Sequence, residues 1–461
     1  MKQLNFFILA VIAGILLFAS CKKKNDATNI AVKQTQIGAF IASDTLNGSI
    51  KGTMKTGKTY IMTGPCTINF GDTVLMQSGV TINVVSPTAY FLVQGVFISL
   101  GTKDSANWIT VKSISKQDNL TNAQNASNDP AFTSPNLWLG FQCDTCCPLC
   151  VMKWTHLEFA GGVFGTTTPL SAIKSGAKSY CVYFTNPSGV FVFEDSWLYG
   201  GVDDPMRPNG KFCIMRSTFE KSGYIGGDCL NVKHGGVGIA AYNLFVGTAT
   251  NGTKAADKGT NSGPTCQFDM YNNTYVNGGY RQVQTGRGGN INYEQGAFGQ
   301  AYNNLIVNCK FGYRIVGNPI ADTAHIRYGY NYQYGDADSI VGQFYPVGYI
   351  TVPQSTDIPA ISYLPSGYTL GATYSAHSLV GANNPMFVNY PLPCPTGAVI
   401  NYASGFDFHL QSTSPAVGKG FKGFSPMSNQ VPVDPVFGAT KINGPGKDIG
   451  CYQTDGTGNQ H

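Results

Sequence analysis

The chain has 461 residues, of which 12% are charged, and it carries a formal net charge of +5. This small net charge gives no electrostatic basis for binding nucleic acid. Only four glutamates occur, while Gly, Asn, Thr, Tyr and Phe are abundant, and this composition favours short strands and turns over helices. It therefore predicts an all-β protein, built as several domains or as one long solenoid.

Residues 1–20 have the pattern of an export signal. Lys2 precedes an apolar run from Phe6 to Phe18, which is too short to span a bilayer comfortably. Two small residues and Cys21 follow, and this arrangement resembles the lipobox of bacterial lipoproteins, although Phe18 stands where leucine is usual. The resemblance implies lipidation of Cys21 with the two acyl chains that stable anchoring requires. The alternative is an ordinary signal peptide followed by an incidental cysteine.

Residues 21–45 are polar and are expected to form a lipidated tether. The stretch from Lys22 to Asp26 is similar to the one that follows the lipidated cysteine in lipoproteins of the Bacteroidetes. Charged residues at that place direct such proteins to the outer face of the outer membrane. The resemblance therefore implies a lipid-anchored outer-membrane protein exposed on the cell surface, with the periplasmic face as the alternative.

Residues 60–111 consist of short runs rich in β-branched and aromatic residues, separated by glycines, and they predict short strands. Residues 114–136 are polar and predict a long excursion from these strands. A cysteine cluster with the spacing C-x-x-C-C-x-x-C follows at Cys143, Cys146, Cys147 and Cys150. In an exported protein this spacing favours disulfides over a metal centre, with the pairing left open. Four later cysteines lie in apolar strand patterns and are expected to be buried small hydrophobes: Cys213, Cys229, Cys266 and Cys309.

A degenerate repeat recurs in the middle of the chain, in which a small polar residue stands two places before a large apolar one. The large apolar residues are Trp197, Phe219, Phe245, Tyr275 and Ile306, at intervals of 22, 26, 30 and 31 residues. A β-helix coil of three strands and three turns has about this length. The aligned polar residues are Asp195, Ser217, Asn243, Asn273 and Asn304. Their asparagines resemble the asparagine ladder of pectate-lyase-type β-helices.

The C-terminal region carries three further motifs, at 384–389, 407–418 and 448–452. They resemble the closing coils of many secreted bacterial β-helix proteins, and the resemblance implies a C-terminal cap. Together with the repeat, they predict one right-handed parallel β-helix over residues 46–461.

The densest polar stretch of the chain lies between residues 200 and 294, where three successive coils could line one groove. Gly226 to Gly235 resembles the G-D-D-C-I-x-I-K-S-G coil of polygalacturonase-type glycoside hydrolases. Asp228 and Lys233 match this motif, but Gly227 stands where the first catalytic aspartate belongs. Hydrolysis with inversion requires both an acid and a base, so this departure weakens the hydrolase interpretation.

The same stretch also resembles pectate-lyase-like coils. In lyases of this fold a Lys or Arg removes a proton beside a uronate carboxylate that calcium or Arg neutralises. The resemblance implies catalytic roles for Lys233, Arg281 and Arg287. It further implies calcium ligation by Asp203, Asp204 and Asp228. Arg207, His234 and Glu294 are expected to contact substrate.

Each of these residues also has a structural alternative. Arg287 lies in a Gly-rich turn whose carbonyls it could bond, and Asp203-Asp204 before Pro205 could simply initiate a turn. Three functions therefore remain open. The first is a surface polysaccharide lyase, the second a non-catalytic glycan-binding or adhesive protein, and the third a glycoside hydrolase. In each case the expected partner is a polysaccharide, and the expected state is a monomer.

Overall fold

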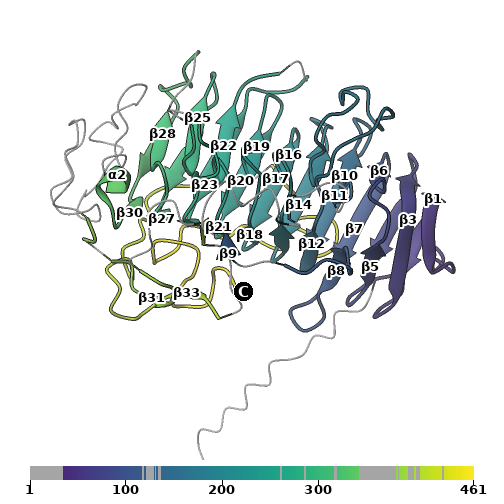
Figure 1. Ribbon diagram of the computed structural model, residues 1–461, viewed down its shortest axis with the longest axis horizontal. Helices are drawn as coiled ribbons and strands as arrows, with labels where there is room; N and C mark the ends of the chain where they lie inside the picture. Colours follow the sequence, from purple (N-terminus) through teal and green to yellow (C-terminus); the bar gives the residue numbers. More distant parts are fainter. Residues whose placement is uncertain are drawn as a thin grey trace, which may run out of the picture. The chain divides into compact units, whose positions relative to one another are not determined.

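The backbone winds through successive coils of three short strands each in a computed structural model of the chain (Figure 1). The structure describes residues 35–116, 119–120, 129, 131–132, 137–259, 262–284, 287–315, 319–341, 380–382, 384–392, 399–400, 405–427 and 430–461. The predicted export signal, Cys21, the predicted tether up to residue 34 and most of the predicted 114–136 excursion lie outside these residues. Residues 36–461 belong to one compact unit.

The first face of the coils, face A, is a sheet of ten parallel strands. Its members are β2 (Gly52–Met54), β4 (Thr73–Met76), β7 (Val96–Leu100), β11 (Leu149–Lys153), β14 (Val190–Glu194), β17 (Lys211–Met215), β20 (Val237–Ala241), β23 (Gln267–Tyr271), β26 (Gln300–Tyr302) and β29 (Arg327–Gly329). Because each strand pairs with the equivalent strand of the next coil, the sheet runs along the axis of the coils.

Faces B and C form one sheet of 19 strands, because β1 (Thr45–Ser49) and β3 (Thr59–Ile68) continue round the corner between them. Face B continues with β5 (Thr81–Val84), β8 (Asn107–Thr110), β12 (Thr155–Glu158), β15 (Trp197–Tyr199), β18 (Thr218–Glu220), β21 (Leu244–Val246), β24 (Thr274–Val276), β27 (Leu305–Val307) and β30 (Tyr332–Tyr334). Face C continues with β6 (Phe91–Val93), β10 (Phe141–Cys143), β13 (Val182–Phe184), β16 (Met206–Pro208), β19 (Leu230–Val232), β22 (Thr253–Ala256), β25 (Ile291–Glu294) and β28 (Tyr313–Ile315).

The elements outside the coils are short. They are β9 (Asn119–Leu120) paired with β32 (Val399–Ile400), β31 (Phe387–Asn389) paired with β33 (Asp407–Leu410), and α2 (Asp338–Val341). Within the described ranges, no helix has the length and apolar character needed to cross a membrane. The all-β right-handed parallel β-helix predicted from the repeat is therefore confirmed.

The interior of the coils is filled by the inward residues of all three faces, since side chains alternate along a strand. Equivalent residues of successive coils stack, as in the row Phe219, Phe245 and Tyr275, whose rings follow one another at 4.9 Å. Three of the four clustered cysteines, Cys143, Cys147 and Cys150, also lie inside.

The described cysteines are free thiols, so the expected disulfides are absent from the structure. Cys143 hydrogen-bonds to Cys147 and Cys150, and burial together with these neighbours raises its pKa well above the ordinary value. The buried thiols act here as small hydrophobic side chains. The same role, predicted for four further cysteines, is confirmed for Cys213, Cys229, Cys266 and Cys309.

The predicted asparagine ladder is present and one rung longer than expected. Asn243 donates its side-chain amide to Asn273 at 3.1 Å, Asn273 to Asn304 at 3.1 Å, and Asn304 to Asn331 at 2.9 Å. The residues just before the rungs have positive φ angles of 47–59°, which Asn adopts more readily than most residues. They are Asp195, Arg216, Tyr242, Asn272, Asn303 and Tyr330. The Asn-Asn pairs therefore combine a left-handed turn residue with a ladder rung.

One part of the predicted alignment was wrong by one residue. The strands pair Leu198 with Phe219 and Trp197 with Thr218, so Trp197 faces outward. The residue in line with Ser217 is accordingly Ser196, whose backbone N–H donates to the Ser217 hydroxyl at 3.2 Å. Asp195 precedes the ladder and instead forms an ion pair with Arg216 at 2.8 Å.

The C-terminal segment from residue 405 onward, called the tail, lies along the side of the coils (yellow in Figure 1). Its contacts, in chain order, join Phe421 to Asn303, Pro435 to Lys153, Asp448 to Asn272 and Asn459 to Ser217. Apolar outward residues of face A, such as Val192 and Tyr271, form one cluster with Phe424 and Ile449 of the tail. The resemblance implied a terminal cap, whereas these segments form a second hydrophobic core outside the coils.

Candidate functional site

The outer surface of face C carries a row of polar side chains, one from each coil. Arg207 follows Met206, which pairs with Leu230, and so lies beside Asn231. The pairing then continues from Asn231 through Lys254 and Asn292 to Arg314. These residues point outward because their strand neighbours fill the interior.

A second polar row lies in the turns that precede face C. The side chain of Asp204 accepts hydrogen bonds from the backbone N–H of Asp228 at 2.8 Å and from the Asn231 amide at 2.6 Å. In the next coil, the side chain of Asp228 accepts the amide of Asn251 at 2.6 Å. Each carboxylate thus fixes the turn and the amide of the following coil.

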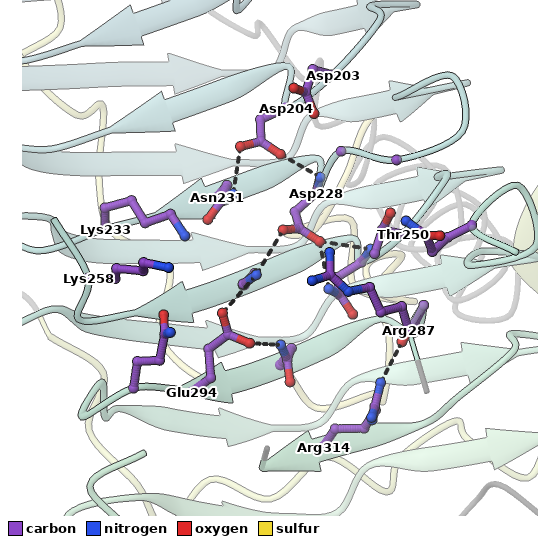
Figure 2. Close-up of a pocket in the computed structure, with 18 residues that line it drawn as sticks. Asp203, Asp204, Asp228, Asn231, Lys233, Thr250, Lys258, Arg287, Glu294 and Arg314 are labelled. Carbon is purple, nitrogen blue, oxygen red and sulfur yellow. Dashed lines mark hydrogen bonds and ion pairs between the residues drawn. The ribbon is translucent and has the colours of Figure 1, made fainter. Parts of the chain in front are cut away.

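These rows border a pocket of about 520 Å³ on face C. The side chains and backbone that line it come from Asp203, Asp204, Gly226, Gly227, Asp228, Asn231, Lys233, Thr250, Asn251, Lys254, Lys258, Gln282, Arg287, Gly288, Asn292, Glu294, Gln295 and Arg314. Figure 2 shows Lys233 and Lys258 on one side, Arg287 on the other, and the carboxylates of Asp228 and Glu294 between them. Five cationic side chains thus face four carboxylates.

Lys254, which lines the pocket, forms ion pairs with two carboxylates. Its ammonium lies 3.3 Å from Asp228 and 2.8 Å from Glu294. Burial alone would lower the pKa of Lys254, but the charges of these two carboxylates outweigh burial and raise it above its ordinary value. Lys254 therefore stays charged and fixes both carboxylates.

Lys233 has the opposite electrostatic environment. It is 8% exposed, and burial, with the nearby charges of Lys254 and Arg207, lowers its pKa to about 8. Burial and the charge of Asp228 raise the pKa of Asp204 to about 6. The pocket therefore brings together an amine and a carboxyl group whose pKa values are both shifted toward neutrality, as acid–base catalysis requires.

Several buried oxygen atoms of the pocket have no hydrogen-bond partner. They are Asn231 Oδ1, Thr250 Oγ1, Asn251 Oδ1, Asn292 Oδ1 and Gln295 Oε1. The amide nitrogens of the three asparagines donate to Asp204, Asp228 and Glu294, so their carbonyl oxygens are held away from these carboxylates. A buried polar atom without a partner is costly, and these oxygens are closed off from the open space of the pocket.

Most of the predicted site residues are brought together in this pocket. Its lining contains six of them: Asp203, Asp204, Asp228, Lys233, Arg287 and Glu294. Arg207 lies at the end of the outward row, where it stacks on Tyr180 at 5.0 Å and bonds its hydroxyl. His234 is hydrogen-bonded through Nδ1 to Asp257 at 2.7 Å and is not part of the lining.

Arg281, predicted to be catalytic, has a structural position instead. It is 1% exposed, and its guanidinium donates to the carbonyls of Ser222, Gly223 and Tyr224 at 2.7–3.0 Å. Its guanidinium carbon also lies 4.8 Å from the ring centroid of Phe132. Burial lowers the pKa of Arg281 below its ordinary value. These contacts hold the turn that carries Gly226 and Gly227 and leave Arg281 outside the pocket lining.

The predicted calcium ligands do not form a metal-binding group. Across the described residues, no three His, Cys, Asp or Glu side chains are placed to hold a metal ion. The oxygens of Asp204 and Asp228 accept hydrogen bonds or contact Lys254. The pocket's acidic residues thus orient neighbouring side chains.

Sequence reasoning missed Lys254, Lys258, Arg314 and the two outward asparagines. Lys254 stands in the strand sequence Thr-Lys-Ala-Ala, which resembles no motif. Lys254 could have been found from its position in the repeat, because Asn231, Lys254 and Asn292 occupy the same place in successive coils.

Comparison with known proteins does not add to this picture. No family model, no curated protein and no solved structure matches the chain. The likeness to pectate-lyase-type coils therefore rests on short sequence motifs alone.

Proposed function

We propose that the chain binds an acidic polysaccharide in the face C pocket and cleaves it by β-elimination. The observation that carries this proposal is Lys233, a nearly buried lysine whose pKa is lowered to about 8 within a pocket rich in cations. A lysine with this pKa is partly uncharged near neutral pH and can act as a general base.

In the proposed reaction, the neutral amine of Lys233 removes the proton from the sugar carbon next to the carboxylate. The electron pair of that C–H bond forms a double bond, the bond to the next sugar's oxygen breaks, and this oxygen takes up a proton from water. Arg287 and Lys258 lie across the pocket from each other and would neutralise the uronate carboxylate.

We further propose that the protein is a lipoprotein, anchored to the outer membrane through Cys21 and exposed on the cell surface. The support is the signal over residues 1–20 and the lipobox-like sequence before Cys21. An anchored enzyme in this place would meet extracellular polysaccharide directly.

The proposal is tested by incubating the protein with polygalacturonate, alginate and hyaluronan and following ultraviolet absorbance, which rises as unsaturated uronate ends form. Lys233→Ala should abolish the rise. Lys233→Gln keeps a polar side chain of similar length but has no group that can accept the proton, so it should bind glycan without cleaving it. Lys211→Ala, at an exposed position of face A, is the matched control and should retain activity.

Two other outcomes would replace the proposal. New reducing ends without an absorbance rise would indicate hydrolysis, with the raised pKa of Asp204 favouring it as the acid. Glycan binding without any product would indicate a non-catalytic binding protein.

A further inference from the structure

The pocket occupies only the later coils of face C. Its lining residues lie between Asp203 and Arg314. In the two coils before them, Gln142 of β10 and Tyr183 of β13 stand in the same outward row as Arg207. An uncovered row would leave outward side chains exposed, yet Gln142 is 0% and Tyr183 is 7% exposed. The outer surface of these earlier coils is therefore covered.

The cover is a hairpin formed by residues 161–180, which leave the coil between β12 and β13 and are called the cover hairpin. Its two arms pair antiparallel at Val163 and Lys178, and backbone hydrogen bonds of 2.9 and 2.7 Å flank this pair. Apolar side chains of the hairpin and of the coils form one small buried cluster of Leu139, Phe164, Leu170, Ile173 and Tyr183. The cover hairpin is thus held to face C by packing as well as by its own hydrogen bonds.

Tyr180 and Arg207 form the edge of this cover that faces the pocket. The ring centroid of Tyr180 lies 5.0 Å from that of Tyr183, and the guanidinium carbon of Arg207 lies 5.0 Å from the Tyr180 ring centroid. Arg207 also donates a hydrogen bond to the Tyr180 hydroxyl. Arg207 lies beside Asn231 in the outward row, and Asn231 lines the pocket. The edge therefore closes the pocket on the side of the earlier coils.

We infer that the pocket takes the end of an acidic polysaccharide chain, so that cleavage releases short fragments from that end. This inference rests on the proposed function and names its substrate class. An internal segment of a polymer needs an open path on both sides of the bond that is cleaved. A chain lying along face C leaves the pocket in one direction only, because Tyr180 and Tyr183 fill the space in the other.

The position of Lys233 sets the length of the fragment. Lys233 belongs to the coil that follows the coil of Arg207, and Tyr180 precedes β13 in the coil before that. Neighbouring strands lie about 4.8 Å apart, so the proposed base is about 5–10 Å along the axis from the closing edge. This leaves room for one or two sugar units between that edge and the bond that breaks. One of the two fragments carries the unsaturated end, so absorbance rises whichever way the chain is oriented.

The first test compares long and shortened chains of the cleaved polysaccharide at equal mass concentration, with initial rates read from ultraviolet absorbance. Chains ten times shorter present ten times as many ends, so we expect kcat/KM per unit mass to rise about tenfold. Mass spectrometry at low conversion should find fragments of one or two sugar units. Equal rates at equal mass, with a ladder of fragment lengths, would overturn the inference and leave the proposed function standing. No absorbance rise from any acidic polysaccharide sinks the proposed function itself.

A pair of variants tests the cover hairpin directly. Gly176 donates its backbone N–H to the Gly165 carbonyl at 3.2 Å, so removal of residues 166–175 joins ends that already lie together. Combined with Tyr180→Ala, this deletion should open the path and produce longer fragments. Tyr180→Phe keeps the ring and is the matched control, which should release the same short fragments as the unaltered protein. Unchanged short fragments from an opened variant with native circular dichroism would contradict the inference. If that variant does not fold, the comparison of chain lengths decides.

Discussion

The asparagine ladder gives the sharpest prediction about stability, through the substitution Asn273→Ala. Asn273 is fully buried and, like Asn304, has asparagine rungs on both sides. Its side-chain oxygen accepts the backbone N–H and the amide of Asn243 at 3.0 and 3.1 Å, and its amide donates to Ala240 and Asn304 at 2.9 and 3.1 Å. Alanine removes all four bonds at once.

The cost follows from the groups that are left behind. The backbone N–H of Asn243 loses its acceptor and the Ala240 carbonyl loses a donor, both in the dry interior. A buried group without a partner costs about 1–3 kcal/mol, so we expect the free energy of unfolding to fall by about 3 kcal/mol. Asn331→Ala, at the end of the described ladder, removes fewer bonds and should cost less. Asn47→Ala, at an exposed position, should cost almost nothing.

Urea unfolding followed by tryptophan fluorescence measures these differences as shifts of the midpoint at constant slope. The order of destabilisation should be Asn273→Ala, then Asn331→Ala, then Asn47→Ala. An Asn273→Ala protein within about 0.5 kcal/mol of the Asn47→Ala protein would refute the reasoning, because that is the range of ordinary surface substitutions.

Four further predictions concern other parts of the chain. The kcat/KM for polysaccharide cleavage should rise as pH increases through about 8, because the base form of Lys233 grows over that range, and a profile falling there would contradict its role. Arg281→Ala should lower the free energy of unfolding by about 3–5 kcal/mol, seen as a lower urea midpoint, while glycan affinity of the folded protein is retained. A thiol reagent should label Cys146 before any buried cysteine of its cluster, as mass spectrometry of the native protein would show. Cys21→Ser should move the protein from the membrane fraction to the soluble fraction, and unchanged fractionation would exclude lipid anchoring through this residue.

The fold was predictable because a solenoid repeats its local rules. Each coil has a polar ladder residue at the same turn, and the recurrence of Asn243, Asn273 and Asn304 identifies this turn in the sequence. The alignment failed only where two small polar residues, Asp195 and Ser196, adjoin and either could be the rung. Spacing alone does not distinguish a left-handed turn residue from the rung that follows it.

The site was predictable in part, because a sequence motif identifies a residue but not the direction in which its side chain points. Asp228 and Lys233 stand in a motif and reach the pocket. Arg281 also stands in a motif-like stretch, but its side chain turns inward to backbone carbonyls that no sequence pattern names. Lys254 was missed for the opposite reason, since its importance comes from the coils before and after it.

The tail has a consequence for the solubility of the coils. It covers apolar residues of face A from β11 to β26. A chain cut before residue 405 would therefore keep a long apolar flank uncovered, even with all of its coils formed, and such a flank promotes association with other chains. His461 stacks on Trp197 at 3.7 Å, so the cover reaches from the late coils back to the middle of the described chain.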